Sequence, residues 1–313
     1  MLNFSNTPLL EIIKNLQIKI ETIQTQKTVE FEVINPDISS STYNGNIIVV
    51  DNQEYIYRGF KTWVDLAQQL HCKMLTPKYI SSTSIIIRFL KLNLDDSFHK
   101  KITDKEEKYG EHSIFSEIHK NEESAYLVHY IKALQNVNLD KRQRILNLGV
   151  NSADEFEVIQ KYSSNFKNLE LVGIDYCSSA INAAKKKFEH YENVSFYTHD
   201  INDLSSLELD KFDLIISIGT LQSSNLEFNP LFMSIVQNQL KRDGSMILGF
   251  PNCRWIDGEM IYGAKVKHYP FSEMSLLYKD AVFCKKYLQQ KKFRVTITGK
   301  DYIFLTATSI RKD

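Results

Sequence analysis

The sequence lacks closely spaced cysteines, a net charge and any long apolar run. Its four cysteines lie far apart and form no Cys-x-x-Cys pair: Cys72, Cys177, Cys253 and Cys284. We therefore expect neither a disulfide framework nor a structural zinc site. No apolar run approaches the roughly 20 residues of a membrane span, and the amino-terminal residues lack the basic start and cleavage site of a signal peptide. These absences predict a cytoplasmic protein without a membrane partner.

The charges of the chain are balanced, with 38 Lys and Arg against 38 Asp and Glu. This balance removes any global electrostatic argument for binding nucleic acid or an anionic membrane. A local basic cluster remains, although a solvated helix face would carry the same residues: Lys285, Lys286, Lys291, Lys292 and Arg294. A nucleic-acid partner is therefore compatible with the sequence but is not favoured.

The chain of 313 residues is long enough for two globular domains. Apolar residues in its first third recur at helical spacing in some segments and alternate at period two in others, which predicts a small α+β unit over residues 1–100. We assign this unit an accessory role in substrate recognition, and we expect a charged linker over 101–112. The expected elements are helices over 9–23 and 62–70 and strands over 28–34, 46–50, 54–58 and 84–94.

The second domain, residues 113–313, is organised around a strand, turn, helix and strand that run from Arg144 to Asp175. The apolar residues at 145–150 predict a buried strand of a parallel sheet. Gly149 lets the backbone come close to a ligand, and Asn151 favours a tight turn. The next strand, 169–174, ends on Asp175, where a carboxylate is well placed to accept hydrogen bonds from a ribose diol.

This segment resembles motif I of the class I S-adenosylmethionine-dependent methyltransferases. Gly149, Asn151 and Ala153 stand where the family usually carries three glycines, and Asn147 stands where it carries an acidic residue. The elements that follow match the family in order, and the resemblance covers residues 113–313. The expected elements are helices over 178–191 and 231–240, a turn over 241–244, and strands over 194–198, 212–218, 245–250, 293–299 and 302–308.

The resemblance implies an α/β fold, a doubly wound sheet of seven strands whose last strand is antiparallel, and S-adenosylmethionine as cofactor. It implies that Asp175 binds the ribose and that Asp200 accepts from the adenine amino group. Gly219, at the exit of the fourth strand, would lie beside the methionine part. The full set of implied cofactor-binding residues is Asn147, Gly149, Asn151, Asp175, Tyr176, Asp200, Ile201, Ser217 and Gly219.

A long helix over 113–139 precedes the first strand, and in this family such a helix often closes over the cofactor. Its early residues, His119 and Lys120 among them, would lie near that site, although a solvated helix face explains them as well. His112, His119 and His129 lack the spacing of metal ligands, so we expect no metal site.

Residues 251–272 follow the fifth strand and are expected to form the substrate wall, because open α/β sheets place their sites at the carboxyl ends of the strands. An ordinary surface excursion is the alternative. The substrate-binding candidates are Arg254, Trp255, Tyr262 and His119, and the candidate acids or bases are Glu259, Tyr262 and His268.

Three functions are consistent with these residues. The first is a methyltransferase that acts by in-line displacement on a small molecule or another polar acceptor. The second is a binding or regulatory protein on a methyltransferase scaffold without catalysis. The third is an RNA methyltransferase whose amino-terminal unit recognises the RNA.

Overall fold

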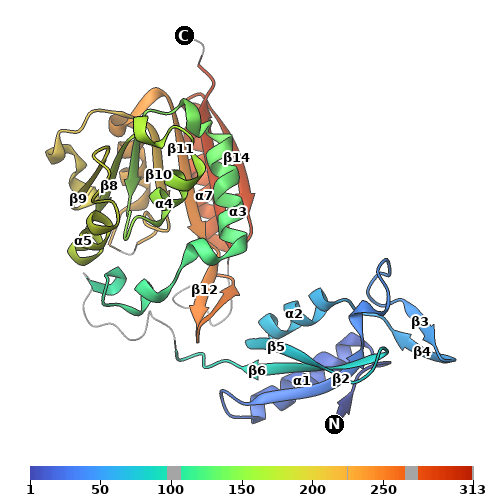
Figure 1. Cartoon of the computed structure of the whole chain (residues 1–313). Coiled ribbons are helices and arrows are strands. Elements are labelled where there is room, and N and C mark those ends of the chain that lie inside the picture. The colour runs from blue at the N-terminus through green and yellow to red at the C-terminus, as the bar shows by residue number, and fades with distance from the viewer. Residues whose placement is uncertain (97–106, 224, 265–273, 312–313) are drawn as a thin grey trace. The chain divides into compact units, whose positions relative to one another are not determined.

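The computed structural model describes residues 1–96, 107–223, 225–264 and 274–311. The chain divides into two units (Figure 1). The amino-terminal unit comprises Met1–Lys100 together with Trp255–Ile261, and the carboxyl-terminal unit comprises Lys101–Arg254 together with Tyr262–Asp313. The chain therefore returns to the amino-terminal unit after the fifth strand of the second sheet. Residues Trp255–Ile261, which we expected in the substrate wall, are part of that return.

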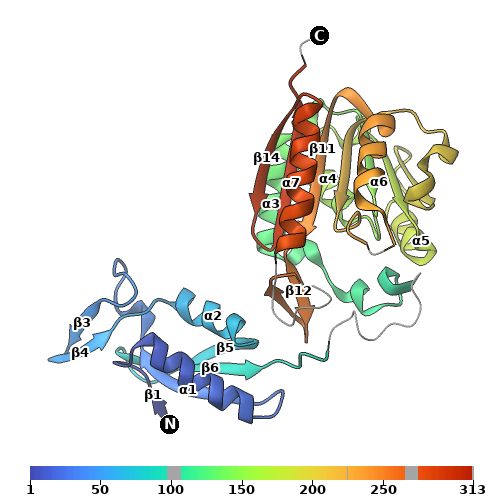
Figure 2. The ribbon, with the colours of Figure 1, turned by 180° about the vertical axis from the view of Figure 1, so that it is seen from behind.

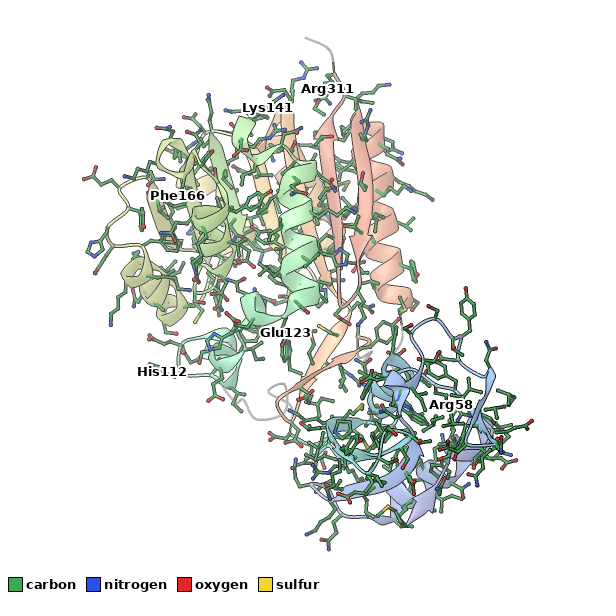
Figure 3. The ribbon with its side chains drawn as sticks, turned by 45° about the vertical axis from the view of Figure 1, so that its right-hand side comes forward. Arg58, His112, Glu123, Lys141, Phe166 and Arg311 are labelled. Atoms are coloured by element: carbon green, nitrogen blue, oxygen red, sulfur yellow. The ribbon has the colours of Figure 1, made fainter. Side chains whose placement is uncertain are left out.

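The amino-terminal unit is a four-stranded sheet in the order β1-β2-β6-β5, packed against two helices. Alternation along β2 buries Val29, Phe31 and Val33 on one face, and these residues form a core with Trp63 of α2 and Leu16 of α1. Arg58, labelled in Figure 3, is also buried. The elements are β1 (Leu2–Asn3), α1 (Leu9–Thr22), β2 (Thr28–Ile34), β3 (Ile47–Val50), β4 (Gln53–Ile56), α2 (Phe60–Gln69), β5 (Cys72–Tyr79) and β6 (Ser84–Lys91).

The tip of the hairpin β12 (Cys253–Ile256) and β13 (Glu259–Tyr262) completes this unit. Ile256 and Ile261 pack with Leu92 in a small apolar cluster. The Asp257 carboxylate accepts a hydrogen bond from the backbone N–H of Asn93 at 2.9 Å, and the Asp257 N–H donates to the carbonyl of Asp96 at 2.9 Å. A segment distant in sequence therefore satisfies backbone groups that follow β6.

The carboxyl-terminal unit is built on a seven-stranded sheet in the order β14-β15-β11-β10-β7-β8-β9. The strands β9, β8, β7, β10 and β11 pair in parallel, whereas β15 pairs antiparallel with both β11 and β14. This arrangement confirms the expected doubly wound sheet and its antiparallel last strand. The strands are β7 (Arg144–Leu148), β8 (Glu170–Asp175), β9 (Val194–Thr198), β10 (Phe212–Ile218), β11 (Leu240–Pro251), β14 (Phe293–Gly299) and β15 (Tyr302–Ser309).

Helices cover both faces of this sheet. Figure 1 shows α3 and α4 in front of the strands, and Figure 2 shows α6 and α7 on the opposite face. Each face has its own apolar core, because parallel strands bury both sides: Tyr126 and Phe156 belong to one cluster and Phe232 and Leu277 to the other. The helices are α3 (Ser124–Asn136), α4 (Asp154–Tyr162), α5 (Ser178–Lys187), α6 (Phe228–Ser234) and α7 (Ser275–Gln290).

Three expected elements differ from the structure. The helix expected over 113–139 is wrong at its start: short 3-10 turns at Ile114–Glu117 and Lys120–Glu122 precede α3. Side chains of the second turn bind α4 rather than repeating on one helical face, so tertiary contacts replace the helical pattern there. The helix expected over 231–240 begins at Phe228 and ends in a π-helical turn, Ile235–Gln239, and the expected turn at 241–244 is an irregular part of β11.

Candidate functional site

The candidate site lies at the edge of the sheet where β7, β8 and β10 end. These strands are neighbours and run parallel, so their carboxyl ends meet at one edge. The turn after β7 carries Gly149, β8 ends on Asp175, and β10 is followed by Gly219. In open α/β sheets this edge is where ligands bind.

The turn after β7 keeps a left-handed backbone at each of its three small residues. The φ angles are 73° at Gly149, 48° at Asn151 and 65° at Ala153. A side chain on Gly149 would overlap the side chain of Thr220, so this glycine is required for space as well as for conformation. Asn tolerates the left-handed region and Ala holds it only under strain. The turn geometry therefore survives at Asn151 and Ala153 without glycine.

Asp175 points toward this turn. Its Oδ2 accepts from the backbone N–H of Asn151 at 2.9 Å, and its Oδ1 accepts from the N–H of Cys177 at 2.9 Å. Burial raises the pKa of the Asp175 carboxyl above its ordinary value, although these hydrogen bonds act in the opposite direction. The carboxylate is therefore held between the turn after β7 and the start of α5.

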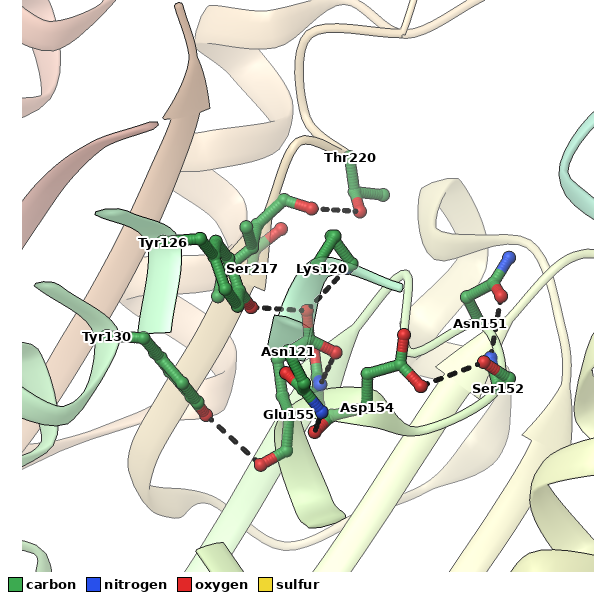
Figure 4. A network of polar contacts seen from close by, with 12 residues as sticks. Lys120, Asn121, Tyr126, Tyr130, Asn151, Ser152, Asp154, Glu155, Ser217 and Thr220 are labelled. Atoms are coloured by element: carbon green, nitrogen blue, oxygen red, sulfur yellow. Dashed lines mark hydrogen bonds and ion pairs between the residues drawn. The ribbon is translucent and has the colours of Figure 1, made fainter. Parts of the chain in front are cut away.

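A buried ion pair lies beside the turn, as Figure 4 shows. Lys120 Nζ lies 2.9 Å from Glu155 Oε1, and the exposed fractions of the two residues are 8% and 2%. The Glu155 carboxylate also accepts from Tyr126 Oη and from Asn147 Nδ2, both at 3.3 Å. Burial lowers the pKa of the Lys120 ammonium, but Glu155 and Asp154 outweigh that effect and the net pKa is raised. Lys120 is therefore a buried cation.

Asn147 has a buried acceptor that no described residue satisfies. It is 1% exposed, and its Nδ2 is used by Glu155, while its Oδ1 has no hydrogen-bond partner among the residues that the structure describes. An unsatisfied buried oxygen costs about 1–3 kcal/mol. A ligand with a donor group at this position would remove that cost.

The segment before α3 is tied to the site. Asn151 Nδ2 donates to the carbonyl of Tyr109 at 2.5 Å, and Asn121 Nδ2 donates to the carbonyl of Asp154 at 3.1 Å. Ser179 Oγ, in the first turn of α5, donates to Glu107 Oε1 at 2.7 Å. Figure 3 shows His112 within this segment and Glu123 at the start of α3. Contacts with the turn after β7, the start of α4 and the first turn of α5 thus hold residues 107–122 in place.

Other predicted cofactor residues make local contacts. Asp200 Oδ1 accepts from the N–H of Asn202 at 2.9 Å, Ser217 Oγ donates to the carbonyl of Leu148 at 3.2 Å, and Ile201 is buried. Gly219 has a φ of 75°, and Tyr176 is 49% exposed beside Asp175. The structure brings together Asn147, Gly149, Asn151 and Asp175. In contrast, Asp200 Oδ1 and Ser217 Oγ are already engaged in hydrogen bonds within the chain.

The predicted substrate residues are not gathered in one place. Glu259 pairs with Lys73, and both it and Trp255 belong to the amino-terminal unit. Tyr262 Oη donates to Met274 Sδ at 2.9 Å, and His119 is exposed. His268 lies outside the described residues. Buried Arg254 Nε has no hydrogen-bond partner in the described part of the chain.

The sequence placed Lys120 near the site, but it did not predict that Lys120 pairs with Glu155. The two residues are distant in sequence, and no local spacing connects them. The sequence carried one signal of this arrangement. Asn147 stands where the family usually has an acidic residue, so a carboxylate from another element can take its place.

No group of His, Cys, Asp and Glu within the described residues could hold a metal ion. Among the described helices, none combines the length and the apolar character needed to cross a membrane.

Several known proteins are similar to part of this chain. A family model described as a methyltransferase domain matches residues 139–296, just over half of the chain. No curated protein matches the chain significantly. One similar solved structure is the N-methyltransferase NodS from Bradyrhizobium japonicum WM9, in complex with S-adenosylhomocysteine, at 14% identity over 60% of this chain and 89% of that chain, with a TM-score of 0.42.

A second is magnesium protoporphyrin IX methyltransferase from Synechocystis PCC 6803 with bound S-adenosylmethionine, at 16% identity over 61% of this chain and 80% of that chain, with a TM-score of 0.40. A third is precorrin-6y C5,15-methyltransferase from Geobacter metallireducens GS-15, at 11% identity over 57% of this chain and 88% of that chain, with a TM-score of 0.40.

Proposed function

This chain belongs to the methyltransferase-domain family, and we propose that it transfers a methyl group from S-adenosylmethionine to a small-molecule or other polar acceptor. The observation that carries the proposal is the contact between Asp175 and the turn after β7. The Asp175 carboxylate is 2.9 Å from the N–H of Asn151, so the residue proposed for the ribose and the turn proposed for the amino-acid end are adjacent.

The charge of the site supports this cofactor. S-adenosylmethionine carries a sulfonium, an ammonium and a carboxylate, so its net charge is positive. Asp154, Glu155 and Asp175 lie near Lys120, which gives the site more negative than positive groups. The unsatisfied Oδ1 of Asn147 adds an acceptor where a cationic donor would gain a hydrogen bond. The residues present therefore fit the group.

When bound, the cofactor supplies a methyl carbon on a sulfonium, and the acceptor atom bonds to that carbon as the carbon–sulfur bond breaks. The contribution of the chain is to bind, orient and exclude water. Gly149 permits close approach of the backbone, and Asp175 fixes the ribose. The segment of residues 107–122, anchored by Asn151 and Asn121, shields this edge of the sheet.

A general base is needed only when the accepting group must lose a proton. Of the candidates proposed for this step, Glu259 is paired with Lys73 and the Tyr262 hydroxyl is bonded to Met274. We therefore propose that the chain accelerates the transfer by positioning and desolvation. We assign selection of the acceptor to the amino-terminal unit. The four unpaired cysteines suit a reducing cytoplasm, where we place the reaction.

The experiment uses the full chain, cofactor with a labelled methyl group, and a cell extract separated into small molecules, RNA and protein. We expect label in the small-molecule fraction, and much less of it with D175A at a cofactor concentration near the wild-type Kd. Label in the RNA fraction would instead favour the RNA methyltransferase, and its binding would weaken steeply with salt. Cofactor binding without transfer to any fraction would favour the regulatory scaffold.

A further inference from the structure

Arg58 is a buried cation without a carboxylate partner among the described residues. It lies between β4 and α2 in the amino-terminal unit and is 4% exposed (Figure 3 labels it). Its Nη2 donates to the carbonyl of Thr7 at 2.6 Å, and its Cζ lies 5.8 Å from the ring centre of Trp63. Burial lowers the pKa of the Arg58 guanidinium, and no carboxylate acts in the opposite direction. Because arginine stays protonated in proteins, the described residues leave the cost of burying this charge without an offset.

The amino ends of two helices meet at this guanidinium. α1 begins at Leu9, two residues after Thr7, and α2 begins at Phe60, two residues after Arg58, so the bond between Arg58 and Thr7 joins both starts. A helix amino end carries a partial positive charge. Neither helix is capped by a side chain, and the first turn of α2 holds no acid. The first turn of α1 holds Glu11, which is exposed and makes no ion pair with Arg58.

Several donors at this point have no acceptor. A guanidinium carries five N–H groups, and within the described residues Arg58 donates only through Nη2. The indole Nε1 of Trp63, near the start of α2, is buried and lacks a partner in the described part of the chain. Asn44 Oδ1 accepts from the N–H of Gly59 at 2.8 Å, but it is a neutral acceptor. Donors and positive charge are therefore in excess, and an oxyanion would complete them.

We propose that Arg58, at the amino ends of α1 and α2, binds a carboxylate or phosphate group of a ligand. The planar guanidinium donates to the oxygens of such a group, and the two helix ends add a favourable potential. The site does not depend on methyl transfer, because the residues that form it all lie in the amino-terminal unit. One further step rests on the proposed function: since this unit selects the acceptor, the acceptor carries the oxyanion.

The test uses the full chain and a fluorescent residue beside the site. The chain has two tryptophans, so W255F leaves Trp63 as the only one. Inorganic phosphate and acetate are each titrated into W255F at an ionic strength held constant with sodium chloride. We expect at least one anion to change the Trp63 fluorescence saturably and to raise the midpoint of thermal unfolding. We expect R58M in the same background to bind that anion at least roughly 10-fold more weakly.

Two further variants protect this comparison. R58K keeps the positive charge but not the planar fork, so it tests the site if R58M does not fold, and we expect an affinity between those of W255F and R58M. R88Q is the matched control, because Arg88 is a guanidinium of the same unit whose Nε already donates to Glu30 Oε1 at 3.0 Å. We expect R88Q to bind the anion as W255F does.

The absence of a saturable response to either anion would overturn the inference. Equal affinities of W255F, R58M and R58K would overturn it too, because the anion would then bind elsewhere. The source of the oxyanion is read from methyl transfer to the small-molecule fraction. Inhibition by the anion that is competitive with the acceptor, and weaker in R58K, supports an anionic acceptor; any other pattern rejects that step and leaves a site for a free anion. Anion binding without any methyl transfer would reject the proposed function alone.

Discussion

Lys120 Nζ and Glu155 Oε1 lie 2.9 Å apart in the buried network beside the turn after β7. Removal of one partner of a buried pair leaves an uncompensated charge and costs about 3–5 kcal/mol. We expect K120M to lose stability in this range and K120M/E155Q to lose less, because the double variant has neither charge. Chemical denaturation of both variants and of E155Q measures the coupling. Strictly additive losses would show that the two charges do not interact.

The alkaline stability of the protein should depend on the same lysine. Glu155 and Asp154 raise the folded-state pKa of Lys120 above the ordinary lysine value of 10.5. The stabilising contribution of Lys120 is therefore complete below pH 10.5 and is lost as the pH rises through the folded pKa. Other groups titrate in this range, so the comparison is between wild type and K120M. We expect their difference in unfolding free energy to shrink above that value. A constant difference would contradict the raised pKa.

Gly149 should be the least replaceable residue of the turn. G149A combines a left-handed backbone, which costs about 1–2 kcal/mol for a non-glycine residue, with an overlap of its Cβ and Thr220. Gly45 is the matched control, because its φ is 89° and no atom lies within 4 Å of an added Cβ. We expect G149A to destabilise the protein more than G45A and to weaken binding of S-adenosylhomocysteine. Equal effects in thermal unfolding would show that Thr220 yields freely.

Binding should weaken as the pH falls toward the pKa of Asp175. The carboxylate form is needed to accept from a ribose diol, and burial raises the pKa of Asp175 above the ordinary aspartate value of 3.8. Protonation should therefore compete with the ligand at a higher pH than for an exposed aspartate. Linkage to folding has the opposite sign, because protonation removes the cost of a buried charge as pH falls. Calorimetry across the acidic range tests the binding effect, and an affinity that stayed constant down to pH 3.8 would oppose it.

The hairpin tip should stabilise the amino-terminal unit. Asp257 has a φ of 52° and accepts from the N–H of Asn93. D257A loses the acceptor and strains the turn, whereas D257N keeps an oxygen and tolerates the conformation. We expect D257A to cost about 1–3 kcal/mol and D257N to cost less. Limited proteolysis of residues within 1–96 measures the loss, with ligand affinity unchanged. Equal protection of the two variants would reject this role.

Much of the carboxyl-terminal fold could be predicted because its strands carry local patterns. Short apolar runs at 145–150 and 169–174 and the polar ends Gly149 and Asp175 identify a parallel sheet and its binding edge. The strands expected over 46–50 and 54–58 pair as β3 and β4. Asp51 and Asn52 join them with left-handed φ angles of 50° and 61°, which these residue types tolerate.

What could not be predicted depends on contacts between distant residues. The start of α3 was misplaced because Lys120 and Asn121 bind α4 instead of continuing a helix. The return of Trp255–Ile261 to the amino-terminal unit has no local signature either, since its cause is burial of Ile256 and Ile261 against Leu92. The sequence therefore predicted one continuous substrate wall over residues 251–272.

The most direct test of cofactor binding is the heat of binding of S-adenosylhomocysteine to the full wild-type chain, measured beside D175A. We predict saturable binding at one site per chain and a roughly 10- to 100-fold weaker affinity for D175A. No heat of binding with a folded wild-type protein, or equal affinity of the two proteins, would contradict the claim that Asp175 and the turn after β7 hold the cofactor.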